Sequence, residues 1–374
     1  MESGKSNRWV LWLAASALLG AGTYTAWWLT TQNTPPPTKV EKPAGSSLSN
    51  ITLTEVDKNG KLLWEIKAER AEYSDDRRKA AVLKITSKFF RDGKPLIEAT
   101  GEGGSIDQSS REITIEGNVK AIALKDNIKL SADRMVWQSD QDLLTATGNV
   151  KVEKVADKIT ITGKILKANP GANRFTIEKD VVATVVKPPL KLESPILTWE
   201  ANKNLVIGQA PFRIVQTKDD VRIRADRGEW NTVTQKANLN GNVRLRAPKS
   251  NLEVLTAKLT WDVVKQLITL PTTINVSSQS RGVSIAANSG QINLASQKVN
   301  LIGNIEAISK TIQAVLTSDT VEWMIPEQQI TVEGNVNYRQ TEKNVNVKGS
   351  KAVTNLAAQT IQITGTDVVT QITP

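Results

Sequence analysis

The sequence contains no cysteine and no histidine among its 374 residues. Without cysteine the chain has no disulfide, no thiolate nucleophile, no lipoprotein anchor and no zinc site of the usual kind. Without histidine it lacks the side chain best suited to proton transfer near neutral pH. Chemistry based on carboxylates or lysine stays open, but no cluster of such residues stands out. We therefore expect no enzymatic activity, no catalytic residues, no metal site and no cofactor.

Helical periodicity and proline are also scarce in most of the chain. From Leu48 onward no segment shows a convincing helical period, and proline is rare within the segments that alternate apolar and polar residues. Because proline cannot donate a ladder hydrogen bond, this scarcity is typical of strands. The exceptions are Pro170, Pro188, Pro189, Pro195 and Pro211. The sequence therefore predicts an all-β fold that is least regular in its middle.

The formal net charge is +10, from 48 Lys and Arg against 38 Asp and Glu. A basic excess favours anionic partners such as phosphorylated lipid, a membrane surface or nucleic acid. The basic residues are scattered among acidic ones with no dense run and no nucleic-acid motif, so nucleic acid is not an expected partner.

Residues 9–29 hold no charged side chain. Their 21 positions suffice to cross a bilayer core of roughly 30 Å as a helix. Lys5 and Arg8 precede the segment and predict a cytoplasmic N-terminus over residues 1–8. A cleaved signal peptide is the alternative, but its apolar region is usually only about 7–15 residues long. The predicted membrane anchor residues are the tryptophans near the two ends: Trp9, Trp12, Trp27 and Trp28.

Residues 30–47 are polar and rich in proline, which predicts an extended linker.

The sequence after the linker contains an internal repeat. Counting from Gly117 in steps of 31 residues gives Gly148, Lys179, Ala210, Gly241, Thr272, Gly303, Gly334 and Gly365, without an insertion or deletion. A nine-fold repeat in strict register predicts a stack of equivalent units, each in contact with its neighbours.

Each unit of 31 residues contains two segments with strand-like alternation. In the second segment the apolar residues flank the repeat position, as Ile115 and Val119 do around Gly117. In the first segment the apolar parity changes midway, for example between Leu130 and Met135. A change of face within one strand requires a bulge or bend, which lets one strand serve two sheets. The pattern predicts long, bent strands with one face toward an apolar interior.

Tryptophan recurs eleven residues before the repeat position, and Ile106 and Ile292 replace it in two units. One interpretation is a column of packing residues that closes the interior, because stacked repeats align equivalent side chains. The other is that part of the column lines a path for lipid. The members are Trp137, Trp199, Trp230, Trp261 and Trp323.

Several local sequences together resemble the LptC family, the membrane-anchored periplasmic component of the lipopolysaccharide export bridge. They are the N-terminal anchor, Gly60 with residues 64–71 (WEIKAERA), Phe89-Phe90 with Gly93, residues 113–119 (ITIEGNV) and residues 132–137 (ADRMVW). The resemblance covers residues 48 to about 155. The later units resemble the related LptA and OstA-like modules, which share the GNV sequence. This chain differs from the short family members by an array of roughly twice the length.

The resemblance implies an elongated, open, trough-like antiparallel β-jellyroll of about nine or ten two-strand repeats after one transmembrane helix. It implies a single-pass protein of the inner membrane with a periplasmic C-terminal domain. Residues 48–187 would form an LptC-like half, and residues 188–374 a second LptC- or LptA-like half continuous with the first. Lipopolysaccharide would be received from the inner-membrane ABC transporter at the N-terminal edge. An LptA-like or outer-membrane bridge component would meet the C-terminal edge.

Two rival functions remain: a membrane-anchored spacer with a packed core and no ligand, and an enzyme on a repetitive β scaffold. The enzyme would need convergent carboxylates, whereas the acidic residues near the repeat positions are whole units apart. The predicted lipid-groove residues lie on the inferred inner face: Ile115, Val150, Val243, Leu245, Trp230, Trp261 and Ile305. Core packing is the alternative explanation for them. Alternating Arg222, Arg224, Arg244 and Arg246 are possible contacts for an anionic headgroup, or a solvated strand face.

Overall fold

The computed structural model describes residues 47–125, 127–156, 158–358, 360–365 and 368–372. Residues 45–374 form one compact unit. The predicted transmembrane segment, its tryptophans and all but the last residue of the predicted linker lie outside the described residues. Among the described residues, no helix has the length and apolar character to span a bilayer.

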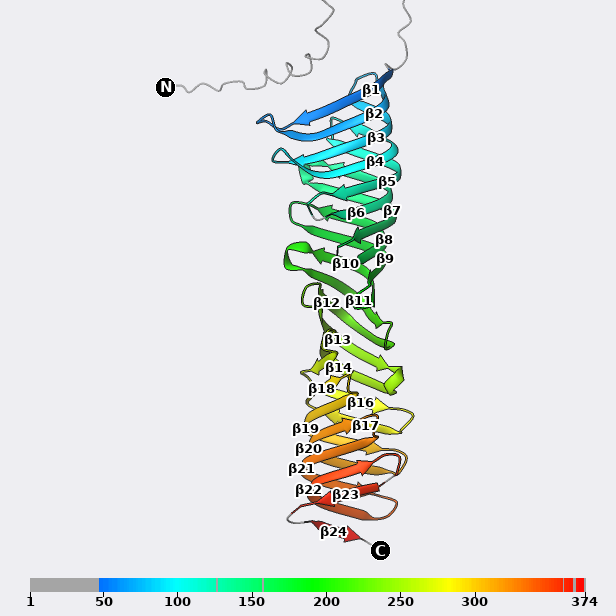
Figure 1. Ribbon diagram of the computed structural model, residues 1–374, viewed down its shortest axis with the longest axis vertical. Coiled ribbons are helices and arrows are strands. Elements are labelled where there is room, and N and C mark those ends of the chain that lie inside the picture. The colour runs from blue at the N-terminus through cyan, green and yellow to red at the C-terminus, as the bar shows by residue number, and fades with distance from the viewer. Residues whose placement is uncertain (1–46, 126, 157, 359, 366–367, 373–374) are drawn as a thin grey trace, which may run out of the picture. The chain divides into compact units, whose positions relative to one another are not determined.

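The described chain is built from antiparallel strands, so the all-β prediction is confirmed (Figure 1). From β2 to β13 the strands succeed one another in chain order, and each pairs with the strands before and after it. The first nine are β1 (Ser47–Val56), β2 (Leu62–Tyr73), β3 (Lys79–Arg91), β4 (Lys94–Asp107), β5 (Glu112–Ala123), β6 (Ile128–Gln138), β7 (Leu143–Lys154), β8 (Ile159–Asn169) and β9 (Arg174–Val185).

Hydrogen bonding continues through the proline-rich middle, since Val185 of β9 is opposite Leu190 of the next strand. Strand pairing is thus continuous across residue 188, and the predicted division into two halves near this residue stays a prediction. The next five strands are β10 (Leu190–Glu200), β11 (Leu205–Gln216), β12 (Val221–Asn231), β13 (Lys236–Ala247) and β14 (Leu252–Asp262). Three short 3-10 turns connect strands: η1 (Ser139–Gln141), η2 (Ala201–Lys203) and η3 (Pro248–Ser250).

After β14 some bent strands are replaced by two shorter ones. One half of β14 pairs with β15 (Leu267–Leu270) and the other half with β16 (Ile274–Ser278). In the same way β19 (Lys298–Ser309) pairs with both β17 (Val283–Ala287) and β18 (Ser289–Asn293). The chain then continues through β20 (Ala314–Met324), β21 (Gln329–Gln340), β22 (Val345–Asn355), β23 (Thr360–Thr364) and β24 (Val369–Ile372).

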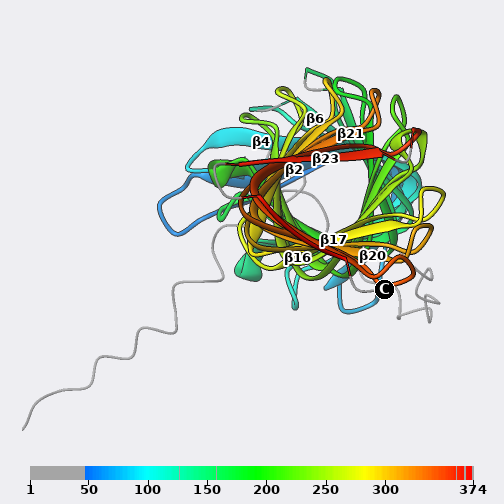
Figure 2. The ribbon, with the colours of Figure 1, turned by 90° about the horizontal axis from the view of Figure 1, so that it is seen from below.

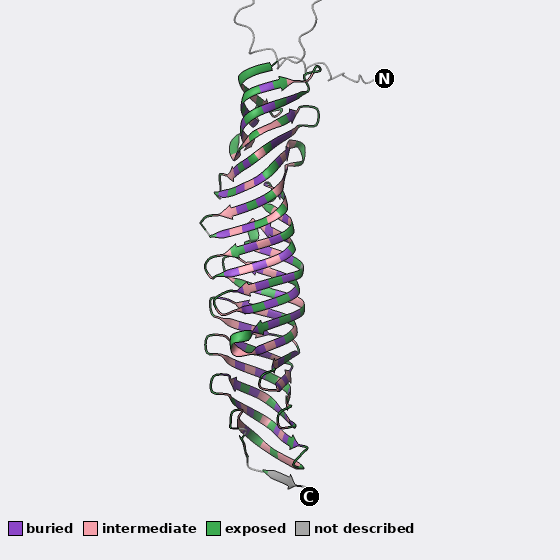
Figure 3. Cartoon of the chain, turned by 90° about the vertical axis from the view of Figure 1, so that its right-hand side faces the viewer, coloured by how far each residue is buried: buried purple, intermediate pink, exposed green. Residues whose placement is uncertain are grey.

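The two halves of each bent strand contribute to two walls that face each other, as the view along the stack shows (Figure 2). Buried and exposed residues alternate along the strands (Figure 3). The buried apolar side chains of both walls form one hydrophobic cluster that reaches from Trp64 to Ala352. Placing one face of the strands from β2 to β22 in this cluster accounts for the alternation in the sequence.

Candidate functional site: the apolar interior and its cavities

The bends in the strands keep the apolar faces directed inward along the stack. At each regular bend the Gly-Asn pair adopts left-handed backbone conformations, as in Gly241 (φ 77°) and Asn242 (φ 43°). The register between β12 and β13 shifts at this point, after the pair Arg224 and Arg244. Between the pairs Arg224–Arg244 and Arg227–Asn240, β13 has one residue more than β12, and the buried residues of β12 change parity at this point, from Ala225 to Gly228. The predicted bulge is confirmed.

A side-chain hydrogen bond crosses from one bend to the next. The amide nitrogen of Asn242 donates to Asp226 Oδ2 at 2.7 Å. The same contact recurs between Asn149 and Asp133 at 3.0 Å and between Asn335 and Asp319 at 2.8 Å. In each pair the asparagine follows the aspartate by 16 residues. These bonds hold neighbouring bends together at the outside of the stack.

One unit replaces this contact without losing the bend. Lys179 and Asp180 stand where other units have Gly-Asn, and both adopt positive φ angles. Lys164 Nζ pairs with Asp180 Oδ2 at 3.0 Å, so an ion pair takes the place of the amide–carboxylate bond. The departure of this unit from the glycine pattern therefore preserves the local conformation.

All seven predicted lipid-groove residues lie in the hydrophobic cluster, and none is more than 3% exposed. They are Ile115, Val150, Val243, Leu245, Trp230, Trp261 and Ile305. Their inward orientation is the one that the sequence pattern indicates. None of them lines either of the two cavities described below. Contact of these residues with lipid therefore stays a prediction, and core packing accounts for their burial in this structure.

The column of recurring tryptophans is also buried. The indole N–H groups of Trp199, Trp261 and Trp323 have no hydrogen-bond partner among the described residues. Trp261 and Trp323 are fully buried, and Trp137 packs against Phe89 with ring centroids 5.2 Å apart. This arrangement agrees with the interpretation of the column as packing residues. The three indole N–H groups place hydrogen-bond donors in an otherwise apolar interior.

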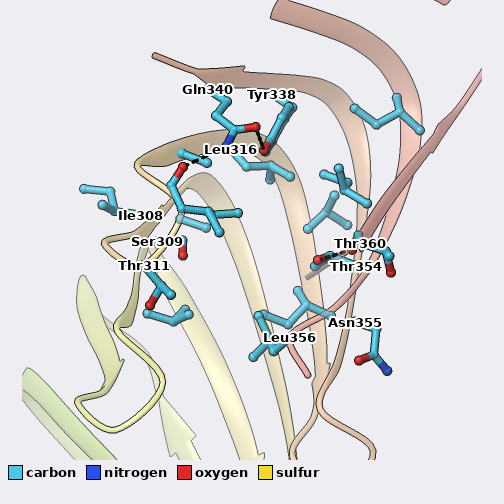
Figure 4. A pocket seen from close by; sticks show the side chains of 18 of the residues that line it. Ile308, Ser309, Thr311, Leu316, Tyr338, Gln340, Thr354, Asn355, Leu356 and Thr360 are labelled. Atoms are coloured by element: carbon cyan, nitrogen blue, oxygen red, sulfur yellow. Dashed lines mark hydrogen bonds between the residues drawn. The ribbon is translucent and has the colours of Figure 1, made fainter. Parts of the chain in front are cut away.

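The interior contains a cavity of about 670 Å³ toward the C-terminal end of the stack (Figure 4). This volume lies within the range of about 300–1,000 Å³ that is usual for small-ligand sites. Its wall is formed largely by inward apolar residues of β19 to β23. They include Ala307, Ala314, Leu316, Ile330, Val332, Val345, Val347, Ile361 and Ile363.

A few polar groups lie in the wall of this cavity. The Tyr338 hydroxyl donates to Gln340 Oε1 at 3.2 Å, and Gln340 Nε2 donates to the Ile312 carbonyl oxygen at 3.1 Å. Burial raises the pKa of the Tyr338 hydroxyl, because the phenolate would lose its hydration there. Arg281 and Lys343 also line the cavity. An apolar cavity with a small number of polar and basic groups suits an amphiphilic anion.

A second cavity of about 70 Å³ lies in the first part of the stack. Its lining includes Leu96, Ile128, Leu166 and Phe175, with Lys125 as a basic residue. It has about a tenth of the volume of the C-terminal cavity. The interior between the two cavities is occupied by interdigitating side chains of the hydrophobic cluster.

The four predicted arginines point away from the interior. Arg222 and Arg224 alternate with the buried residues Val221, Ile223 and Ala225 of β12, and both arginines are exposed. Arg244 and Arg246 are exposed in the same way on β13. The structure thus brings the four arginines together on one outer surface, but it does not bring them to the predicted groove residues.

Within the described residues no three metal-ligating side chains gather at one place. The pKa of Asp57 is lowered chiefly because the backbone N–H of Lys61 donates a hydrogen bond to its carboxylate, which stabilises the turn between β1 and β2.

The sequence analysis did not identify the C-terminal cavity. Its lining residues follow the same inward parity as the packed positions, so alternation alone does not distinguish them. One signal is present in the last unit, where Gly365 is followed by threonine instead of asparagine. At that unit the strand is divided into β23 and β24, both paired with β22.

Comparison with known proteins finds one family to which part of the chain is similar. Residues 13–186 match the family model described as "Lipopolysaccharide-assembly, LptC-related". The predicted resemblance to the LptC family is therefore confirmed for these residues. No curated protein matches the sequence.

Among solved structures, one similar chain is LptH from Pseudomonas aeruginosa. Its title describes it as the LptA homologous periplasmic component of the conserved lipopolysaccharide transport device. The two chains share 12% identity, the alignment covers 42% of this chain and 97% of LptH, and the TM-score is 0.21. A likeness of this size does not by itself establish a common fold.

Proposed function

Because residues 13–186 match the LptC-related family of lipopolysaccharide-assembly proteins, we propose that this chain is a bridge component of lipopolysaccharide transport. It accepts lipopolysaccharide from the inner-membrane ABC exporter and passes it along the apolar interior toward the outer membrane. The observation that carries the proposal is the single hydrophobic interior of the stack with a cavity of about 670 Å³ near its C-terminal end.

Apolar walls are suited to acyl chains, since transferring them from water to an apolar surface is favourable in proportion to the area buried. In the C-terminal cavity the chains would lie against residues such as Leu316, Ile330 and Val332. Elsewhere the walls must separate to admit them, because the predicted groove residues are buried in the hydrophobic cluster. Separation exposes no unpaired backbone groups, since each wall keeps its strand pairing.

The two ends of the stack provide the proposed contacts with other proteins. Among the described residues strand β1 pairs only with β2, so we expect its outer edge to be open to strand addition by the transporter. At the other end β23 and β24 pair with β22, and their outer edges would meet an LptA-like or outer-membrane component. Residues 9–29 would anchor the chain in the inner membrane, with the strands in the periplasm.

The spacer is a second candidate, and a specific observation favours it. Side chains such as Ile115, Val243 and Trp261 are almost completely buried within the hydrophobic cluster. A protein that only holds two membranes apart needs a packed core of this kind and no ligand. The C-terminal cavity is the feature that a spacer does not explain.

Photo-crosslinking in cells separates the two functions. A photoreactive amino acid at Val332, which lines the cavity, is compared with one at Glu333, its exposed neighbour on β21. Transport predicts lipopolysaccharide adducts at position 332 and at the packed positions 115 and 243, with few at position 333. Adducts to protein alone at all four positions would contradict transport and support the spacer.

A further inference from the structure

Five arginines form a compact group on the outer surface of three adjacent strands. This arginine patch comprises Arg213 of β11, Arg222 and Arg224 of β12, and Arg244 and Arg246 of β13. Directly opposite residues are Arg213 and Arg224, Arg224 and Arg244, and Arg222 and Arg246. Opposite residues of antiparallel strands have Cβ atoms about 4.5–5.5 Å apart, so these guanidinium groups share one small area of surface.

The row of outer residues that contains Arg224 can be followed across many strands. Before the patch it runs through Lys120, Ser131, Lys151, Thr162, Val182 and Glu193. After the patch it continues through Leu255, Asn275, Ala286 and Glu306. Neutral residues separate like charges everywhere else in this row. Only at Arg213, Arg224 and Arg244 do three charges of the same sign follow one another.

Carboxylates balance most of the patch but not its centre. Glu253 bonds both Arg244, at 2.9 Å, and Arg246, at 3.3 Å. Arg222 pairs with Asp220 at 2.8 Å, and Arg213 lies 3.7 Å from Glu193. The side chain of Arg224, which stands between two other arginines, has no hydrogen bond or ion pair among the described residues.

Like charges placed directly opposite each other on a sheet destabilise it. The central arginine therefore costs stability in the absence of a ligand, and no side chain of the described chain compensates for it. An anion bound to Arg224 and its neighbours would remove the repulsion. Guanidinium groups bind carboxylate and phosphate through two parallel hydrogen bonds, and phosphate has more oxygens and more negative charge to share among three neighbouring arginines.

We propose that the arginine patch is a binding site for a phosphate group, with Arg224 at its centre and Arg213 and Arg244 on either side. The patch is on the opposite face of the strands from the buried residues Ile223 and Leu245. Binding there is independent of the acyl-chain path, so this inference does not rest on lipid transport. Inorganic phosphate and a phosphorylated sugar of a lipid headgroup share the required chemistry.

The test uses the full chain in detergent solution, with thermal unfolding measured at constant ionic strength. In phosphate-free buffer, Arg224→Gln is expected to raise the melting temperature by about 1 °C, because it relieves the repulsion. Inorganic phosphate is expected to raise the melting temperature of the unsubstituted protein and to lose most of this effect in the variant. The matched control is Arg227→Gln on the same strand, where the arginine is already paired with Glu229 at 3.0 Å.

The control should keep the full phosphate effect and should not gain stability in phosphate-free buffer. A titration followed by phosphorus NMR then identifies the source of the phosphate. Binding of inorganic phosphate as tight as that of a phosphorylated glucosamine disaccharide indicates a site for the free ion, and binding at least tenfold tighter for the disaccharide indicates a headgroup site. An equal response of the Arg224→Gln variant and the unsubstituted protein to both ligands would overturn the proposal.

Discussion

Replacing Gly241 by alanine tests how the bends hold the two walls in place. Gly241 has a φ angle of 77°, and an added Cβ atom would lie 2.5 Å from Asp226 Oδ2 and 2.9 Å from Asp226 Cβ. The same carboxylate accepts the hydrogen bond from Asn242 at 2.7 Å. The substitution therefore forces a left-handed conformation on alanine and displaces the side chain that links two bends.

The two costs can be estimated separately. A left-handed backbone costs a residue other than glycine about 1–2 kcal/mol. Loss of the bond between Asn242 and Asp226 adds about 1 kcal/mol, the usual net value for a protein hydrogen bond. Gly93 provides the control, because its φ angle is 74° and nothing lies within 4 Å of an added Cβ atom. Gly93→Ala should therefore show the backbone cost alone.

The assay is equilibrium unfolding in urea, with the slope of the transition checked for constancy among the variants. Gly241→Ala should lower the free energy of unfolding by about 1 kcal/mol more than Gly93→Ala does. In the background of Asp226→Ala, the cost of Gly241→Ala should fall toward that of the control, since the displaced carboxylate is then absent and only the contact with the Cβ atom of residue 226 remains. Equal costs for Gly241→Ala and Gly93→Ala in the unsubstituted protein would refute this account of the bends.

Three other predictions concern the interior and the turns. Trp261→Ala should lower the free energy of unfolding in urea by about 3–5 kcal/mol. Trp261→Phe should lower it clearly less, because phenylalanine fills much of the space without the unpartnered N–H. Equal costs would contradict the assigned packing role. Burial raises the pKa of Tyr338, so this group should not affect stability below a pH of about 10 and should lower it at higher pH. Tyr338→Phe should abolish this group's part of the fall, as measured by melting temperatures in a pH series. The carboxylate of Asp107 accepts hydrogen bonds from Ser109 and Ser110, which lower its pKa from 3.8. Its contribution to the stability of the folded protein is therefore present above that pH and is lost on acidification. Asp107→Asn should reduce the loss of stability in acid, and an unchanged acid transition would argue against this role.

The sequence by itself determined the positions of the strands and the identity of the inward residues. A strand has a side-chain period of two, so residues such as Ile115 and Val243 could be assigned to the interior without any partner strand. The interval of 31 residues identified equivalent strands, because stacked units must repeat their contacts. The change of parity within the first strand of each unit was enough to predict a bulge.

Only the tertiary structure decided which inward residues pack and which leave space. Leu316 and Ile115 have the same pattern in the sequence, yet Leu316 lines a cavity and Ile115 is enclosed, because the last strands divide and pair differently. The structure also decided that Arg224 stands between two arginines and lacks a carboxylate. Both facts depend on which residues lie opposite each other on neighbouring strands. Such residues are separated in the chain, so no local sequence pattern identifies them.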